Sequence, residues 1–310
     1  MHVLILGAGA LGSLMGARLS KTEVQTTLYS TNEDHTRAIL KNGLLVEELD
    51  GSTQTFPMTA CSTPHAVDKA ADVVLVTVKS YATRQAVSSI LRCCNRATVF
   101  LTLQNGIGNW EQIAQAARPE QALLGTTAQG ATLLEPGRIR HGGNGPTFIG
   151  ERDGPPTARV HDIVKVFMTA GLPTGSSDRM EHLIWEKLMV NVGINAITAL
   201  TNIRNGVIAD LEAGRSLSRI AVLEALQVAQ SKGFSLGEEM VERVLNVARA
   251  TAVNRSSMGQ DVDRKKRTEI DAINGAIVQF AEEAGIAVPV NRTLTQLIQV
   301  MQSNYLNCSQ

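Results

Sequence analysis

The sequence HVLILGAGALG, residues 2–12, decides the fold of the first half of the chain. Its first five residues are almost all apolar, which is typical of a short strand buried on both faces. Its last six follow the pattern G-x-G-x-x-G between that strand and a predicted helix. Gly7 permits a tight turn, Gly9 lets a pyrophosphate approach the backbone, and Gly12 lets helix and strand pack closely. We therefore predict a dinucleotide site at this helix N-terminus, whose N–H groups would face the phosphates.

The end of the second predicted strand, over 24–29, bears on the identity of the cofactor. An acidic residue at this position binds the ribose hydroxyls of NAD, whereas hydroxyl or basic groups suit the phosphate of NADP. Here the strand is followed by Ser30 and Thr31, with Arg37 a little further on. The sequence therefore favours NADP. NAD stays open, because a shift of one or two residues would bring Glu33 to the strand end.

Further strands and helices continue this alternating pattern up to about residue 178. Lys79 and Asn105 each follow a predicted buried strand, at the sheet edge that carries Gly9, where open α/β sheets bind ligands. The predicted helices cover 13–20, 36–42 and 164–171. The predicted strands cover 44–56 as a hairpin, 71–78, 98–103, 123–127, 130–134, 138–141, 148–149 and 172–176.

The stretch WEKLMVNVGIN, residues 185–195, reads as an apolar helix with one polar stripe. Lys187, Asn191 and Asn195 are four residues apart, which places them one above the other on a single face. Buried amide and ammonium groups need partners, and a bound carbonyl compound could supply them. A solvated polar stripe, or a helix pair joined by asparagine hydrogen bonds, would also give this pattern.

From about residue 179 onward the patterning is helical, with further helices predicted over 217–231, 239–253 and 267–284, and a last helix after Pro289. The expected fold is therefore α/β. A Rossmann-like, doubly wound dinucleotide-binding domain would cover 1–178, and an all-α substrate-binding and catalytic domain would cover 179–310.

Composition excludes several classes of partner. The 310 residues carry 29 basic and 29 acidic side chains, so nothing electrostatic favours nucleic acid or an anionic membrane. The cysteines, Cys61, Cys93, Cys94 and Cys308, form neither a metal-spaced set nor a disulfide framework, so we expect no metal and a reducing, cytoplasmic compartment. We also expect no signal peptide and no membrane span, because no apolar run reaches 18 residues.

Taken together, these motifs resemble those of the ketopantoate reductase (2-dehydropantoate 2-reductase) family, nearly end to end. The glycine motif is shared with many dinucleotide enzymes, so other segments carry the resemblance. These are VKSY at 78–81, QNGIG at 104–108, the helix at 185–195, SSMGQD at 256–261 and RTEIDAING at 267–275. The resemblance implies reduction of 2-dehydropantoate to pantoate with NADPH, on the way to pantothenate.

The resemblance also implies roles for individual residues. Lys187 would be the general acid that protonates the ketone oxygen, and Glu269 would bind the substrate and help to hold Lys187. The substrate would be bound by Asn191, Asn195, Asn205 and Ser257. The cofactor side would be lined by Gly7, Ala8, Gly9, Ala10, Leu11, Gly12, Lys79, Asn105 and Ala131. Ser30 stands where family members commonly carry an arginine for the NADP phosphate, which weakens the prediction of NADPH over NADH.

Two other functions fit the same sequence. One is a family relative that reduces another small 2-oxo acid or ketone, since the polar stripe does not specify the rest of the substrate. The other is a non-catalytic NADP-binding redox sensor, which would need neither Lys187 nor Glu269. A homodimer is compatible with the helical half, whose exposed faces the sequence does not identify.

Overall fold

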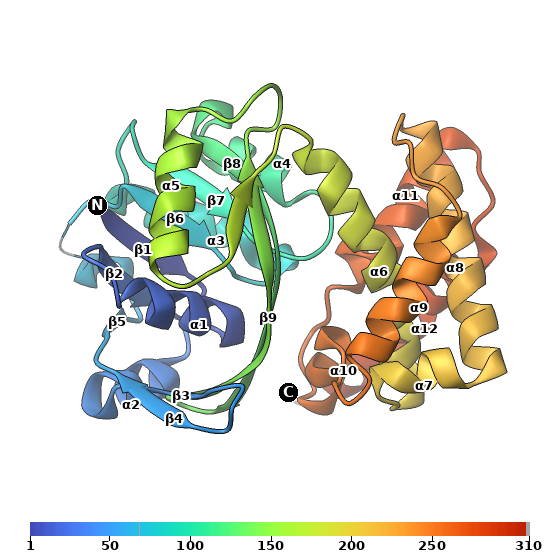
Figure 1. Cartoon of the computed structure of the whole chain (residues 1–310), viewed down its shortest axis with the longest axis horizontal. Coiled ribbons are helices and arrows are strands. Elements are labelled where there is room, and N and C mark those ends of the chain that lie inside the picture. Colours follow the sequence, from blue (N-terminus) through green and yellow to red (C-terminus); the bar gives the residue numbers. More distant parts are fainter. Residues whose placement is uncertain (68, 308–310) are drawn as a thin grey trace. The chain divides into compact units, whose positions relative to one another are not determined.

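The computed structural model describes residues 1–67 and 69–307, which form two compact units (Figure 1). The first unit comprises residues 1–104 and 108–181, and the second comprises residues 105–107 and 182–310. The short segment 105–107 therefore belongs with the helical half of the chain, although both of its neighbours in sequence belong to the first unit. Each unit is described by itself below.

The first unit is built on one mixed sheet, ordered β4-β3-β9-β8-β7-β6-β1-β2-β5, with β10 paired to β9. From β8 to β5 every neighbouring pair is parallel, and the chain winds outward in both directions from β1. This is the doubly wound arrangement predicted from the sequence. The strands are β1 (His2–Leu6), β2 (Gln25–Tyr29), β3 (Leu44–Glu47), β4 (Thr53–Phe56), β5 (Thr59–Cys61), β6 (Val73–Val76), β7 (Val99–Thr102), β8 (Ala122–Glu135), β9 (Arg138–Gly150) and β10 (Thr174–Ser176).

Apolar side chains fill both faces of this sheet. Along β1, Val3 and Ile5 join one hydrophobic cluster, and Leu4 and Leu6 join another. Successive side chains of a strand point to opposite faces, so a nearly continuous apolar run is what a strand covered on both sides requires. The α-helices of this unit are α1 (Ala10–Leu19), α2 (Glu33–Asn42), α3 (Thr83–Ile90), α4 (Asn109–Ala116) and α5 (Ala158–Thr169).

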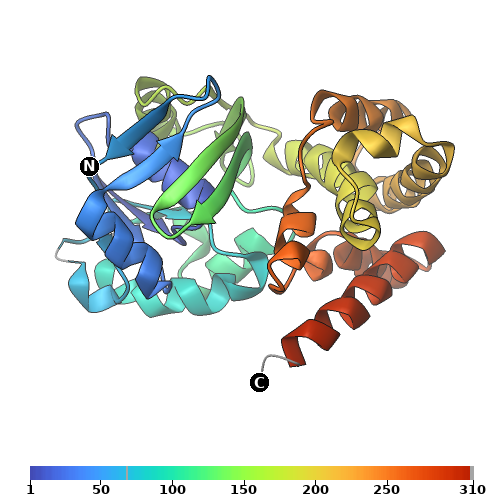
Figure 2. The ribbon, with the colours of Figure 1, turned by 90° about the horizontal axis from the view of Figure 1, so that it is seen from below.

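One part of the sheet differs from the prediction. The four short strands expected between 123 and 149 are two long antiparallel strands, β8 and β9, whose register shifts at three places. One shift lies between Gly130 and Ala131, and glycines at such irregularities resemble turn signals in sequence. Figure 2 shows this hairpin in green beside the β3–β4 hairpin in blue, and β3 pairs with β9 in parallel.

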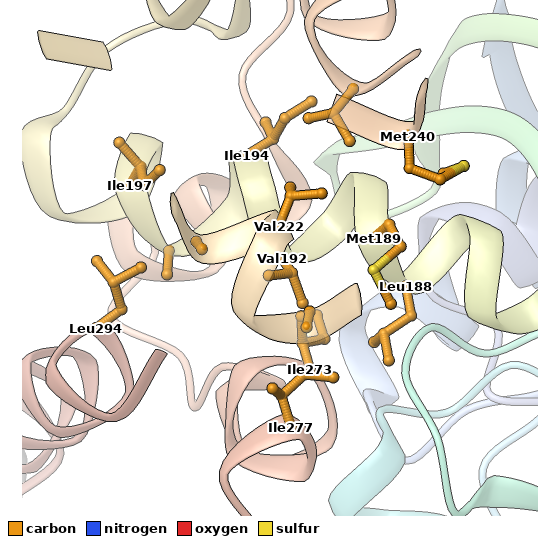
Figure 3. Close-up of a cluster of buried hydrophobic side chains, with 14 of the residues drawn as sticks. Leu188, Met189, Val192, Ile194, Ile197, Val222, Met240, Ile273, Ile277 and Leu294 are labelled. Atoms are coloured by element: carbon orange, nitrogen blue, oxygen red, sulfur yellow. The ribbon is translucent and has the colours of Figure 1, made fainter. Parts of the chain in front are cut away.

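The second unit is helical and packs around α6 (Met180–Thr201), which begins two residues before the unit does. Leu188, Met189 and Val192 of α6 lie among apolar side chains of the surrounding helices (Figure 3). The other α-helices are α7 (Asn205–Asp210), α8 (Glu212–Ser231), α9 (Glu239–Ala250), α10 (Ser257–Asp263), α11 (Asn274–Ala284) and α12 (Pro289–Asn307).

The helix predicted over 267–284 is wrong in its first half. Residues 264–269 are irregular, a single 3₁₀ turn covers Ile270–Ala272, and α11 begins only at Asn274. Helical spacing of apolar residues extends through this segment, but spacing alone does not register a 3₁₀ turn that interrupts the helix. Glu269 therefore lies on a turn rather than on a helix face.

By length and composition α6 could cross a membrane, with a mean hydropathy of 1.2 over its most apolar 18 residues. This departs from the expectation of no such segment, but 61% of that window is buried inside the protein, as in the central helix of a core. Cys61, Cys93 and Cys94 form no disulfide, and Cys308 lies outside the described residues. Across the described residues, no group of three or more His, Cys, Asp or Glu could hold a metal ion.

Candidate functional site

The glycine loop between β1 and α1 is shaped by three different constraints. Gly7 has a φ of +104°, which L side chains rarely adopt. A Cβ on Gly12 would lie 2.4 Å from the carbonyl oxygen of Gly7 and 2.6 Å from Oγ1 of Thr77. A Cβ on Gly9 would meet no described atom closer than 4.0 Å. Gly9 is therefore the glycine that the protein's own packing does not require, as expected where a ligand approaches the backbone.

Hydrogen bonds hold this loop in place. The amides of Gly7 and Ala8 both donate to the carbonyl of Tyr29, at 3.0 and 2.9 Å. The hydroxyl of Thr77 donates to the carbonyl of Gly7 at 2.9 Å. Helix α1 begins after Gly9 with no capping side chain and no acidic residue in its first turn. Its N-terminus is thus unneutralised, which suits an anion such as a pyrophosphate.

The strand-end residues that bear on NADP or NAD lie beside this loop in the same unit. The amide of Asn32 donates to Oγ of Ser30 at 3.2 Å, and Thr31 is exposed. Arg37 is exposed and paired with Asp34 at 3.2 Å. Ser30 retains a hydroxyl proton to donate, but Arg37 would have to leave its partner to reach a phosphate.

The other residues predicted to line the cofactor side in this unit lie on different elements. Lys79 is partly buried and lies directly before the 3₁₀ turn Ser80–Ala82, three residues beyond the end of β6. Ala131 is partly buried in β8, opposite His141 of β9. Ala10 and Leu11 form the first turn of α1.

In the second unit, Lys187 lies on α6 and interacts electrostatically with Glu269 of the 264–269 segment. Burial lowers the pKa of Lys187 from 10.5 to about 8, and the Glu269 carboxylate opposes part of that shift by favouring the charged ammonium. Glu269 is only 6% exposed. The Glu269 carboxylate thus acts on the charge of Lys187, and the lysine has the pKa of a group that can exchange a proton near neutral pH.

The two asparagines of the α6 stripe carry unsatisfied amides. Asn195 is 5% exposed, and Lys187 and Asn191 are partly buried, so the stripe is not a fully solvated face. The Nδ2 atoms of Asn191 and Asn195 are buried and have no hydrogen-bond partner among the described residues, so they do not join a helix pair either. Leaving a buried amide unpaired costs about 1–3 kcal/mol, which makes such groups candidates for contact with a ligand.

Asn205 and Ser257 stand at the first positions of α7 and α10. Nδ2 of Asn205 donates to Oγ1 of Thr251 at 3.0 Å, while its buried Oδ1 has no partner in the described part of the chain. Ser257 is exposed. Its neighbour Ser256 is buried, accepts a hydrogen bond from the hydroxyl of Thr198 at 2.7 Å, and caps α10 by accepting from the amide of Gly259.

The 105–107 segment is docked on the turn that follows Glu269. The amide of Ile107 donates to the carbonyl of Ala272 at 3.0 Å. A Cβ on Gly106 would lie 2.4 Å from that same oxygen, and the φ of Gly106 is +81°. Only glycine fits, so the QNGIG motif fixes Asn105 beside the Glu269 turn. From its position after a strand, the sequence predicts that Asn105 lines the cofactor side, and that role stays a prediction.

A buried polar network in this unit was not predicted. Glu224 of α8 accepts hydrogen bonds from the amides of Val290 and Asn291, both at 2.9 Å, and so caps α12. Nδ2 of Asn274 donates to Oδ1 of Asn291 at 3.0 Å and, more weakly, to the carbonyl of Val192 in α6. These partners are 17 to 82 residues apart in sequence, so no local pattern reveals them.

Comparisons with known proteins agree with this architecture. The family model described as Ketopantoate reductase PanE/ApbA matches residues 3–154, and the one described as Ketopantoate reductase PanE/ApbA C terminal matches residues 179–302. The 2-dehydropantoate 2-reductase of Halobacterium salinarum is 41% identical over 302 residues, which are 97% of this chain and 99% of that relative.

Two solved structures extend the comparison. A PanE/ApbA family ketopantoate reductase from Ralstonia eutropha has a TM-score of 0.90 at 30% identity, covering 99% of this chain and 100% of that one. D-mandelate dehydrogenase with NADH and anilino(oxo)acetate has a TM-score of 0.92, covering 98% and 99%, but at 23% identity this likeness concerns the fold alone. Because both family models match and together span most of the sequence, the chain belongs to the ketopantoate reductase family.

Proposed function

We propose that this protein reduces 2-dehydropantoate to pantoate with NADPH, with Lys187 as the general acid. The observation that carries the proposal is the stripe on α6, where a lysine of lowered pKa stands one turn from the first of two buried, unpaired amides. Relatives named 2-dehydropantoate 2-reductase support the substrate. A 2-oxo acid offers a ketone oxygen to protonate and polar groups to bind.

Lys187 would supply the proton of this reaction. Addition of hydride to a carbonyl carbon leaves negative charge on the oxygen, and a protonated amine beside that oxygen both stabilises the charge and neutralises it. With a pKa of about 8, Lys187 is mostly protonated at neutral pH yet gives up its proton more readily than an ordinary lysine. Glu269 would keep the ammonium charged and oriented.

The unpaired amide atoms would bind the rest of the substrate. Nδ2 of Asn191 and Asn195 are donors, which suits carboxylate or hydroxyl oxygens. Oδ1 of Asn205 is an acceptor, which suits a substrate hydroxyl. A pair of donors and one acceptor matches a hydroxylated 2-oxo acid. Ser257, exposed at the start of α10, could add a further hydrogen bond.

The first unit would bind the cofactor. The open space at Gly9 and the uncapped N-terminus of α1 fit a pyrophosphate, and Lys79 and Ala131 are further candidate contacts. When bound, the nicotinamide supplies the hydride. NADPH is proposed over NADH because Ser30 and Thr31 follow β2 without an acidic residue. The variant Ser30→Arg tests this position and should increase the preference for NADPH, whereas an unchanged NADPH-to-NADH ratio would mean that the phosphate binds elsewhere.

The test is the oxidation of NADPH, and separately of NADH, by purified protein with added 2-dehydropantoate. Lys187→Ala should lower kcat by about a hundredfold or more, the scale of a lost general acid. Lys187→Met is the matched variant that keeps most of the side-chain volume. A near-wild-type rate in both variants would reject Lys187 as the acid.

Other outcomes separate the alternatives. Turnover with NADH alone would keep the reaction and change the cofactor. Cofactor binding without turnover of 2-dehydropantoate would point to another 2-oxo acid, to be tested with a panel of short branched and hydroxylated compounds. A redox sensor would bind cofactor, turn over no member of that panel and be insensitive to Lys187→Ala.

A further inference from the structure

A chain of hydrogen bonds in the first unit connects three segments that are distant in sequence. The amide of Gly137, in the turn between β8 and β9, donates to Nδ1 of His35 at 2.9 Å. Nε2 of His35 lies 3.1 Å from Oγ of Ser13, and that hydroxyl donates to the carbonyl of Ala8 at 3.3 Å. His35 and Ser13 are 1% and 0% exposed, so water does not compete for these bonds.

The direction of every bond in this chain follows from its first donor. A backbone N–H can only donate, so Nδ1 of His35 must accept and the imidazole proton must be on Nε2. Nε2–H then donates to Ser13, whose own proton is left for Ala8. This arrangement needs a neutral imidazole, and burial lowers the pKa of His35.

The chain ends inside the glycine loop. The hydroxyl of Thr77 donates a hydrogen bond to the carbonyl of Gly7, and the hydroxyl of Ser13 donates one to the carbonyl of Ala8. A rotation of the Ala8–Gly9 peptide would break the second bond and could turn a carbonyl dipole toward a bound phosphate. Fixed backbone dipoles are what make such a loop an anion site.

His35 also belongs to the segment that follows β2. It lies in the first turn of α2, and its amide donates to Oδ1 of Asn32, the capping residue, at 3.0 Å. The amide of Asn32 in turn donates to Ser30. The bond between His35 and Ser13 therefore joins the first turns of α1 and α2, one beside the predicted pyrophosphate loop and the other beside the predicted ribose end.

We propose that His35 is a positioning residue for the nicotinamide cofactor, which acts through Ser13 to hold the Ala8 peptide and to fix the spacing between the glycine loop and the β2 end. The proposal rests on the proposed cofactor site. His35 itself touches no reacting atom. Its effect belongs to the binding of the dinucleotide, not to the 2-oxo acid or the proton transfer.

Two amide variants each keep one of the two hydrogen bonds of the His35 ring and remove the other. In His35→Gln the side-chain amide can reach the position of Nε2 and still donate to Ser13, but the acceptor for Gly137 is lost. In His35→Asn the oxygen can take the place of Nδ1 and accept from Gly137, but nothing reaches Ser13. His2→Asn is the matched control, because His2 is 1% exposed and its Nε2 lies 3.0 Å from the hydroxyl of Thr27, away from the loop.

The measurement is the dissociation constant for NADPH, with NADH in parallel, by fluorescence titration, together with the KM for the 2-oxo acid at saturating cofactor. His35→Asn and Ser13→Ala should each weaken cofactor binding about fivefold, the usual scale for one buried hydrogen bond, and leave the other KM unchanged. Their double variant should be no weaker than either single one, because both break the same link. His35→Gln and His2→Asn should bind cofactor as the wild type does.

The possible results distinguish a failure of the cofactor site from a failure of this inference. A wild-type protein that binds neither nucleotide overturns the cofactor site and this inference with it. A wild type that binds, with unchanged affinity in folded His35→Asn and Ser13→Ala, overturns this inference alone. Equal weakening by His2→Asn would also overturn it, because any buried histidine would then have the same effect. If His35→Asn does not fold, Ser13→Ala carries the test.

Discussion

The proton on Lys187 makes the pH dependence of the reaction the sharpest test of the proposed mechanism. A pKa of about 8 means that about nine-tenths of the protein carries the acid at pH 7 and about one-tenth at pH 9. If Lys187 is the general acid, kcat/KM for reduction should be flat below about pH 7 and fall about tenfold for each pH unit above 8. Oxidation of the alcohol needs the neutral amine, so its rate should rise through the same pKa.

The informative perturbation is Glu269→Gln, which removes a charge and keeps the size and shape of the side chain. The Glu269 carboxylate raises the pKa of Lys187 against the larger effect of burial, so its loss should move the midpoint to lower pH. The maximal rate should also fall, because the ammonium loses its partner. Lys187→Met should abolish the titration and lower the rate by about a hundredfold or more.

The assay follows NADPH absorbance from about pH 6 to about pH 10 at constant ionic strength, with both substrates varied at each pH.

A second readout, the stability of the protein as a function of pH, does not depend on activity. The unfolded chain keeps the Lys187 proton up to about pH 10.5 and the folded chain loses it near pH 8, so unfolded protein binds more protons in this window. Stability relative to Lys187→Met should therefore rise with pH between these values.

Either of two results would refute this reasoning. A wild-type profile with no titration near pH 8, while Lys187→Met is inactive, would mean that the lysine stays charged and acts only by electrostatics. A midpoint that moves upward in Glu269→Gln would mean that the carboxylate does not face the ammonium as a charge.

Three further predictions concern the glycines of the loop, the buried amide of Asn195 and the two serines at the start of α10. Gly9→Ala should leave the free energy of unfolding unchanged or raise it by up to about 1 kcal/mol, and should raise the NADPH dissociation constant about tenfold or more. Gly12→Ala should lower both the free energy of unfolding and the affinity for NADPH, because its Cβ meets Gly7 and Thr77. Denaturation and titration experiments measure these two quantities. Asn195→Leu should raise the free energy of unfolding by about 1 kcal/mol and weaken 2-oxo acid binding at least tenfold, since it removes an unpaired buried amide; a loss of stability without a change in KM would contradict this. Ser256→Ala should cost about 1 kcal/mol through the lost cap of α10, while Ser257→Ala should change only the KM for the 2-oxo acid, as denaturation and kinetics together would show.

The sequence predicted well what depends on neighbouring residues. Strand β1 and the glycine loop were readable because an apolar run and a glycine spacing are contiguous signals. The stripe of Lys187, Asn191 and Asn195 was readable because helical period alone brings these residues to one face. Its burial was not readable, because the surrounding apolar cluster gathers residues from helices far along the chain.

The errors arose where backbone geometry departs from a simple period. The segment before α11 keeps helical spacing but turns as a 3₁₀ helix, so Glu269 was placed on a helix that does not exist there. Gly130 of β8 stands at a register shift in a long strand, where a glycine looks like a loop signal in the sequence. The links from His35 to Ser13 and from Glu224 to Asn291 join residues 22 and 67 positions apart, which no local pattern encodes.

The buried side-chain atoms that lack a hydrogen-bond partner do not all have the same significance. Among the described residues, buried side-chain atoms without a hydrogen bond occur at Thr26, Arg138 and Asn274, in addition to the three asparagines of the proposed substrate site. At Asn274 the other amide atom is bonded within the network of α8 and α12, so the group is largely satisfied. Asn191 and Asn195 differ, because two unpaired donors recur one helical turn apart and continue a row that begins with a lysine of lowered pKa.

A row of this kind has a cost in the free protein that a ligand can remove. Each unpaired amide costs about 1–3 kcal/mol, and burial of the lysine adds to this, in a fold whose net stability is expected to be only about 5–15 kcal/mol. Apolar side chains of similar size would avoid that cost, so stability alone does not account for these residues. A compound that accepts hydrogen bonds from both amides and a proton from the lysine would offset it, and a 2-oxo acid has oxygen atoms for all three.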